Sequence, residues 1–172
     1  RLGANEAPPA IISMYLGDEL YAVLESIKDG KPLGEHGAQK MTIGVDVLPP
    51  IPKDSTDRNR TSPFAFTGNK FEFRSCGSSL SISGPNTTLD SIVAYTLKEF
   101  ADELEKATDF DAALAELIKR EVTKHWKVIF NGNGYDSSWI DEAEKRGLLN
   151  LRTLPDAMAH YLDSKNVKLF TE

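Results

Sequence analysis

The sequence predicts an α+β fold, with a few short strands in its first half, then a long helical hairpin and C-terminal helices. Two patterns support this prediction. From residue 69 to residue 74, apolar and charged residues alternate with the period of two that is typical of a strand. From residue 86 onwards, apolar residues recur at helical spacing. A length of 172 residues fits one domain, or one domain with an appendage.

The first predicted helix spans residues 7–28. Its apolar positions follow helical spacing, Pro8 and Pro9 fall where a first turn tolerates them, and Asp29-Gly30 ends it. Residues 31–57 contain several prolines and are typical of a loop, with one alternating stretch at 41–48 that predicts a strand. A polar, turn-prone segment then leads through residues 63–66 into the charged strand.

The charged strand places Lys70, Glu72 and Arg74 on one face and Phe71 and Phe73 on the other. The phenylalanine face is apolar enough to be buried. Burying the opposite face, a row of cation, anion and cation, would cost free energy unless ionic partners lie against it. Two interpretations stay open at this point: a ladder of ion pairs, or a metal ion together with phosphate groups.

The rest of the chain is expected to be helical. A short strand is indicated at 80–82, and residues 86–87 can cap the next helix. Residues 137–138 can cap a later helix that ends at Gly147. The short link before Asp109 predicts that the first two helices form an antiparallel hairpin. The expected elements are helices at 86–104, 109–126, 138–146 and 155–164, with a turn at 131–134.

Composition excludes several classes of protein. A net charge of −6 argues against a nucleic-acid partner, and the absence of an apolar run of eighteen residues argues against a membrane span. The single cysteine, Cys76, excludes an internal disulfide and fits a reducing cytoplasm. With three scattered histidines, a zinc site of the usual composition is not supported. Because the chain starts at Arg1 without Met, we expect it to be a piece of something longer.

Three charged groups could carry chemistry, and each has a structural alternative. Glu72 between two cations would be a stable carboxylate, unsuited to a general base but suited to a hard divalent cation. Arg60, in the turn-prone segment, could clamp a phosphate or a carboxylate, or be a solvated surface arginine. Arg1 and Glu6 lie in a glycine-containing loop, where Glu6 could simply stabilise the start of a helix.

Three motifs in order, R-L-G-A-N-E-A-P, N-R-T-S-P-F and N-K-F-E-F-R, resemble the late catalytic motifs of glutamine synthetase, most closely its long type III form. The resemblance covers residues 1 to about 97, and the helical tail resembles the type III C-terminal extension. It implies that residues 1–108 are a C-terminal part of the catalytic domain, with few antiparallel strands, and that residues 109–172 are a helical extension.

The resemblance also implies a role for each matching residue. These roles concern the substrate glutamate, the ATP phosphates, the divalent ion and the closing of the site. Arg1 matches the arginine that holds glutamate, Glu6 the flap glutamate that accepts a proton from ammonium, Arg60 a catalytic arginine near the transferred ATP phosphate, Lys70 an ATP contact, Glu72 a metal ligand, and Arg74 the arginine near glutamate and the phosphoryl group. Two positions depart from the pattern, since Lys70 replaces an arginine fork and Ala65 replaces a phosphate-contacting arginine.

The implied parent protein is a cytoplasmic glutamate–ammonia ligase. It would use ATP and Mg²⁺ or Mn²⁺ to make glutamine from glutamate and ammonia by way of a γ-glutamyl phosphate, in a ring-shaped homo-oligomer, a dodecamer. The β-grasp domain and the earlier catalytic motifs are not in this sequence, so the chain alone is expected to be inactive. The alternatives are a non-catalytic or regulatory relative, in which the charged strand is a structural salt bridge, and a ligase that joins another amine to glutamate.

Overall fold

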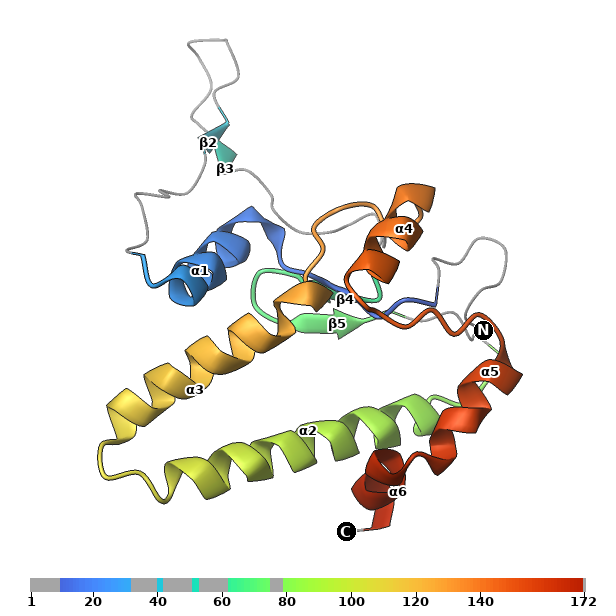
Figure 1. Cartoon of the computed structure of the whole chain (residues 1–172). Coiled ribbons are helices and arrows are strands. Elements are labelled where there is room, and N and C mark those ends of the chain that lie inside the picture. The colour runs from blue at the N-terminus through green and yellow to red at the C-terminus, as the bar shows by residue number, and fades with distance from the viewer. Residues whose placement is uncertain (1–9, 32–39, 42–50, 53–61, 75–78, 172) are drawn as a thin grey trace.

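The computed structural model of the chain describes residues 10–31, 40–41, 51–52, 62–74 and 79–171. The predicted α+β class is confirmed: within these ranges the strands come early, and six α-helices with two short 3₁₀ helices make up most of the structure (Figure 1). No helix in the described ranges is long and apolar enough to cross a membrane.

A small sheet of three strands carries the charged motif. β4 (Phe64–Phe66) is its central strand, with β1 (Met14–Tyr15) parallel on one side and β5 (Phe71–Phe73) antiparallel on the other. β2 (Lys40–Met41) and β3 (Ile51–Pro52) form a separate antiparallel pair. The expected antiparallel pairing therefore holds for two of these pairs, whereas β1 joins the sheet in parallel. Most of the strand predicted at 41–48 lies outside the described residues.

The first helix begins later than the sequence predicts. α1 spans Gly17–Asp29, and Met14–Tyr15 shortly before it are extended because β1 pairs with β4. Positive φ values of 75° at Gly17 and 65° at Gly30 mark the two ends of the helix, and both fall in the region that glycine adopts without strain. The predicted end at Asp29-Gly30 is confirmed. The predicted start at residue 7 lies outside the described residues, but strand pairing excludes a helix that is continuous through β1.

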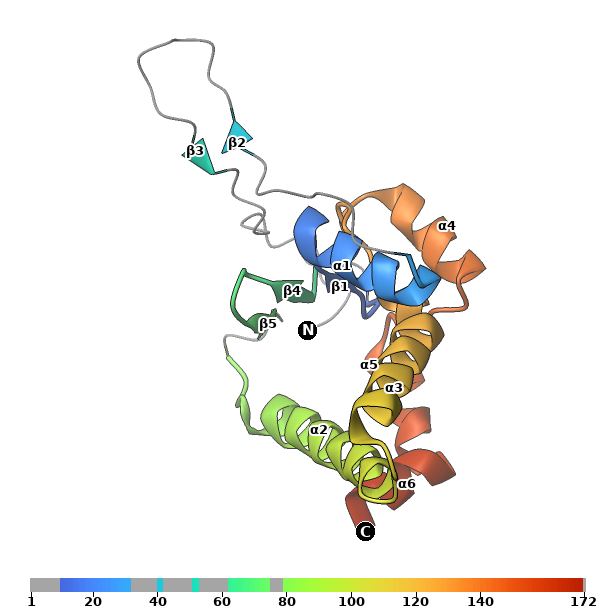
Figure 2. The same ribbon diagram turned by 90° about the vertical axis from the view of Figure 1, so that its left-hand side faces the viewer.

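The predicted helical hairpin is present but open. α2 (Ser83–Leu104) and α3 (Phe110–His125) diverge from their short connection in both views (Figures 1 and 2). The side chain of Asp109 caps α3 by accepting a hydrogen bond from Ala112 N at 3.1 Å. α2 begins before the predicted caps at residues 86–87, and the residues just ahead of it form a bend, so the strand predicted at 80–82 is wrong.

The C-terminal region is more broken than predicted. After a 3₁₀ turn, η1 (Trp126–Val128), comes α4 (Ser137–Lys145), which is capped by Asp136 rather than by a serine and is followed by Gly147 at φ 67°. The single helix predicted at 155–164 is instead a series of three short elements: α5 (Leu154–Met158), η2 (Ala159–Leu162) and α6 (Ser164–Thr171).

The buried core joins the segment before β1 to α4. Ile11, just before β1, packs with Trp139 and Ala143 of α4, and each of the three is at most 2% exposed. The Phe130 ring stacks on Trp139 with 3.8 Å between the ring centroids. In contrast, α2 has no buried residue. The division at residues 108/109 therefore stays a prediction, and this core shows that segments on either side of it pack together.

Candidate functional site

The charged strand folds as the alternation predicts. Oε1 of Glu72 lies 3.3 Å from Nζ of Lys70, and its Oε2 accepts hydrogen bonds from Arg74 Nη2 at 3.2 Å and Nε at 3.4 Å. The Arg74 side chain is 18% exposed, whereas that of Lys70 is 65% exposed. The carboxylate is thus held from one side by a mostly buried guanidinium and from the other by an exposed ammonium group.

The two cations set the charge state of the carboxylate. Hydrogen bonds from Lys70 first, and then from Arg74, lower the pKa of Glu72 below its ordinary value. Glu72 is therefore ionised throughout the neutral range. An ionised oxygen with one face toward solvent can take part in an ion pair or bind a hard divalent cation.

The sheet register places two further residues in the row of Glu72. Ala65 pairs with Glu72 across β4 and β5, and Tyr15 pairs with Ala65 across β1 and β4. Directly paired residues share a face of the sheet, so Tyr15, Ala65 and Glu72 lie on one face. Ala65, which stands where the motif resemblance implies a phosphate-contacting arginine, is fully buried at the centre of this row.

The phenylalanine face differs from its prediction. Phe71 and Phe73 are 51% and 39% exposed rather than buried. Their rings pair across the hairpin with Phe66 at 5.2 Å and with Phe64 at 4.8 Å. Cross-strand ring contacts thus replace burial for these side chains within the described part of the chain.

The other predicted site residues, Arg1, Glu6 and Arg60, lie outside the described residues. Within the described ranges, no group of three or more His, Cys, Asp or Glu side chains is arranged to hold a metal ion. Glu72 fits a divalent ion as a single ionised ligand, and the described residues do not supply a complete set.

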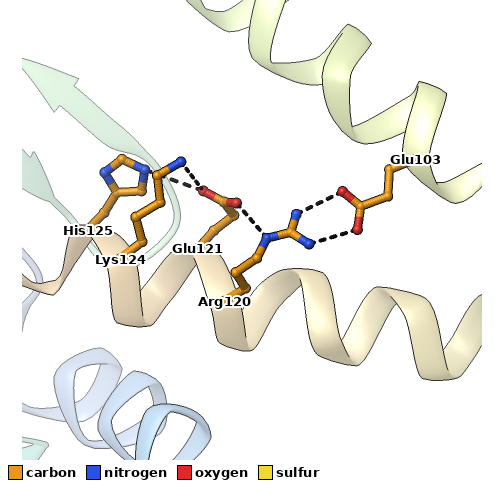
Figure 3. Close-up of polar contacts among 5 residues, drawn as sticks. All are labelled: Glu103, Arg120, Glu121, Lys124 and His125. Carbon is orange, nitrogen blue, oxygen red and sulfur yellow. Dashed lines mark hydrogen bonds and ion pairs between the residues drawn. The ribbon is translucent and has the colours of Figure 1, made fainter.

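A second charged cluster lies on α3 and was not predicted from the sequence (Figure 3). Arg120 donates two parallel hydrogen bonds of 2.8 Å to Glu103 of α2, and its Nε donates to Glu121 at 3.0 Å. Glu121 also lies 3.6 Å from Lys124 and 3.3 Å from His125. The helical spacing of the last three residues could have indicated their contacts. The bond from Arg120 to Glu103 depends on how the hairpin folds.

The partners within this cluster satisfy one another. Arg120 lowers the pKa of both Glu103 and Glu121 by donating hydrogen bonds to their carboxylates. All these side chains lie on the surface of α2 and α3. The cluster therefore pins the two helices together near their connection, and it does not present an unpaired charge to a ligand.

Comparison with known proteins identifies the family to which this sequence is related. Residues 113–172 match the family model described as the glutamine synthetase C-terminal domain. The chain belongs to the glutamine synthetase family. Within that family it is 49% identical over 175 residues to the type-3 glutamine synthetase of Dictyostelium discoideum, an alignment that covers 100% of this chain and 24% of the relative.

Two bacterial proteins give the same result. The chain is 43% identical to a glutamine synthetase of Butyrivibrio fibrisolvens, over 99% of this chain and 24% of that protein. It is 39% identical to a glutamine synthetase of Bacteroides fragilis, over 96% of this chain and 24% of that protein. The chain thus spans about a quarter of the length of the curated relatives it matches.

Proposed function

We propose that this chain is part of an ATP-dependent glutamate–ammonia ligase. The observation that carries the proposal is the ionised, doubly paired carboxylate of Glu72, within a sequence that is 49% identical along its whole length to a type-3 glutamine synthetase. The reaction would activate the γ-carboxylate of glutamate by phosphoryl transfer from ATP, after which ammonia displaces phosphate. This order is chemically required because a carboxylate is a poor electrophile until it is converted to an acyl phosphate.

In this proposal the charged strand forms one wall of the phosphoryl-transfer site. Glu72 would hold Mg²⁺ or Mn²⁺, and the bound ion would neutralise charge that develops on the transferred phosphoryl group. Arg74, with its guanidinium oriented by Glu72, would contact glutamate and the phosphoryl group. Lys70, whose side chain is exposed, would reach the ATP phosphates as a flexible point charge.

The remaining roles rest on the sequence resemblance. Arg1 would bind glutamate, Arg60 would contact the transferred phosphate, and Glu6 would accept a proton as ammonia attacks. Other metal ligands would come from polypeptide that is not in this sequence, and so we propose that the chain alone is inactive. The resemblance also supports a cytoplasmic, ring-shaped homo-oligomer, a dodecamer, with residues 1–108 in the catalytic domain and 109–172 as a helical extension.

The proposal is tested by substitution in the full-length ligase. Glu72→Ala should abolish magnesium-dependent formation of γ-glutamyl phosphate and weaken magnesium binding. Glu6→Ala should retain acyl-phosphate formation but lose amination, because only the second step needs the proton acceptor. Glu116→Ala removes an exposed carboxylate of α3 and serves as a control that should change neither step.

Two outcomes would contradict these assignments. Unchanged magnesium affinity in Glu72→Ala would show that this carboxylate is not a metal ligand. Equal loss of both steps in Glu6→Ala would remove its role as proton acceptor. Replacing ammonia by small primary amines in the same assay tests whether the ligase joins another amine to glutamate.

The geometry also favours a second candidate, a non-catalytic relative in which the strand is a structural salt bridge. Both oxygens of Glu72 already have a cationic partner within the chain. In that case Glu72→Gln would lower stability without changing the binding of magnesium or nucleotide. Measuring unfolding and magnesium binding on the same variant separates the two candidates.

A further inference from the structure

β5, the strand that carries Glu72, has an open edge in the described part of the chain. It is the last strand of its sheet, with β4 beside it and β1 beyond β4 (Figure 2). The Thr67 amide donates a hydrogen bond of 2.8 Å to the carbonyl of Lys70, and the Arg74 amide donates one of 2.7 Å to the carbonyl of Pro63. These two bonds, at the two ends of the hairpin, fix which backbone groups of β5 are directed at β4.

The backbone groups of Phe71 and Phe73 are directed at the open edge. In an antiparallel ladder, pairs of residues that are hydrogen-bonded to each other alternate with pairs that are not. Because the pairs at both ends of the hairpin are bonded, Ala65 and Glu72 form a bonded pair and the two phenylalanine pairs do not. The amides and carbonyls of Phe71 and Phe73 therefore point away from β4, toward the place of a further strand.

The same two residues also expose their side chains. Phe71 is 51% exposed and Phe73 is 39% exposed, and their rings lie with those of Phe64 and Phe66 on one face of the sheet. Glu72 lies on the opposite face. An apolar face of a sheet is normally packed against another layer, and a strand edge is normally paired or covered. Within the described residues, β5 thus has an exposed apolar face and an open edge at the same place.

A second copy of this chain is a poor partner for this edge. Two copies of β5 that pair antiparallel over their full length, centred on residue 72, place Glu72 opposite Glu72 and Lys70 opposite Arg74. Like charges directly opposite each other on a sheet are destabilising. The charges of β5 therefore disfavour this pairing of the strand with itself.

The length of the relatives favours a different occupant. The alignments cover 96–100% of this chain but 24% of each relative, so about three quarters of such a polypeptide lies outside this chain. A strand that belongs to the same polypeptide is held near β5 at a high effective concentration, whereas a separate molecule is not. The rest of the polypeptide is thus the favoured source of a partner for the open edge.

We infer that a strand from the rest of the full-length polypeptide pairs with the open edge of β5. This strand would bond the amides and carbonyls of Phe71 and Phe73, and its alternate side chains would lie on the two faces of the sheet. The side chains on the phenylalanine face would be apolar, and those on the other face would be polar and lie beside Glu72. The inference depends on the geometry of β5 and on the length of the relatives, and not on the activity proposed above.

The first test is hydrogen exchange in the full-length protein, resolved to single amides. The amides of Phe71 and Phe73 should exchange at least about a hundredfold more slowly than in an unstructured peptide, because paired strands exchange only when they open. The Glu72 amide, which is directed at β4, is the internal control and should be protected in either case. Protection of Glu72 without protection of Phe71 and Phe73 would overturn the inference.

The second test identifies the partner by photo-cross-linking in the full-length protein. Phe71→p-benzoylphenylalanine, which keeps an aromatic ring, should form a cross-link to a peptide of the same polypeptide that lies outside these 172 residues. The product should run as a monomer on a denaturing gel, and it should not form in urea. Glu116→p-benzoylphenylalanine, at an exposed position of α3, is the control and should not capture this peptide.

Two results of the cross-linking would contradict the inference. A cross-linked dimer would make a second copy the partner of β5. A cross-link confined to the 172 residues would place the partner within this chain. Neither test requires an active protein, so a negative result here is distinct from a failure of the proposed function, which is read from γ-glutamyl phosphate and glutamine formation.

Discussion

The segment 129–131, which pairs with β1 through Ile129 and Phe130, should be sensitive to a single methyl group added at Gly132. A Cβ atom at this position would lie 2.5 Å from Cζ of Phe130, and 2.9 and 3.1 Å from its two Cε atoms. Carbon atoms in contact prefer about 3.5–4.0 Å, so the Phe130 ring would have to move. The ring cannot move freely because it is stacked on buried Trp139 at 3.8 Å, with the two planes only 11° apart.

The cost of Gly132→Ala follows from these contacts. Forcing an extra carbon into a packed site costs about 1–3 kcal/mol, and weakening an aromatic pair costs about 0.5–1.5 kcal/mol. A reduction in the entropy of the unfolded chain offsets about 0.4–1 kcal/mol of this. We therefore expect a net loss of about 2 kcal/mol in the free energy of unfolding. With a urea slope of about 1–3 kcal/mol per molar, the unfolding midpoint should fall by about 1 M.

The assay is urea unfolding followed by tryptophan fluorescence. Gly84→Ala provides the control, because a Cβ at Gly84 would meet nothing within 4 Å and the residue lies in the first turn of α2. Alanine is the better helix former, so Gly84→Ala should leave the midpoint unchanged or raise it slightly. A midpoint for Gly132→Ala equal to or above that of the unchanged chain, at equal slope, would refute the reasoning.

Three further predictions concern the charged and capping groups. Because the pKa of Glu72 is lowered in the folded chain, Glu72→Gln should reduce the free energy of unfolding near neutral pH. The difference in this free energy between the two proteins should shrink as the pH falls below about 4.3 and through the lower folded-state pKa. A constant difference across that range would contradict the ion pairs. Glu103→Arg should speed trypsin cleavage at Lys106, between α2 and α3, because it breaks the hydrogen-bonded pair of Glu103 and Arg120 at 2.8 Å. Adding Arg120→Glu should restore a pair of opposite charges and slow the cleavage again. Equal cleavage rates at Lys106 in all three proteins would show that the pair does not hold the hairpin. Asp109→Ala should cost about 1 kcal/mol in urea unfolding through loss of the α3 cap, whereas Asp109→Ser should be close to neutral.

The charged strand could be predicted because its geometry is local. The period of two places residues 70, 72 and 74 on one face whatever the rest of the fold does, and the contacts of Glu72 follow from that spacing. The helix end at Gly147 could be predicted for the same reason, since capping involves residues within one turn of a helix. The elements that the sequence predicted well are therefore those whose partners lie within a few residues.

The start of α1 could not be predicted in this way. Residues 11–16 carry apolar side chains at a spacing that suits a helix as well as a strand. Their actual conformation is decided by β4, some fifty residues away, and by Ile129 and Asn131, more than a hundred residues away. Sequence pattern alone identified residues 131–134 only as a turn. It did not indicate that the Asn131 side chain would accept a hydrogen bond at the end of β1, because Leu16 and Asn131 are 115 positions apart and come together only when the chain folds.

The two interpretations of Glu72 that the sequence left open are compatible in the structure. The Arg74 side of the carboxylate is mostly buried, with two hydrogen bonds that hold Oε2. The Lys70 side is exposed, and among the described residues its ammonium group contacts Oε1 at 3.3 Å in an ion pair of a kind that is weak in water. An incoming divalent ion could therefore take Oε1 by displacing only Lys70, which would swing toward the anionic phosphates that accompany such an ion, while Arg74 keeps the carboxylate ionised and oriented. An ion pair in the chain as described is thus the arrangement expected of a metal ligand before its metal binds, and it supports the ligase interpretation as much as the structural one.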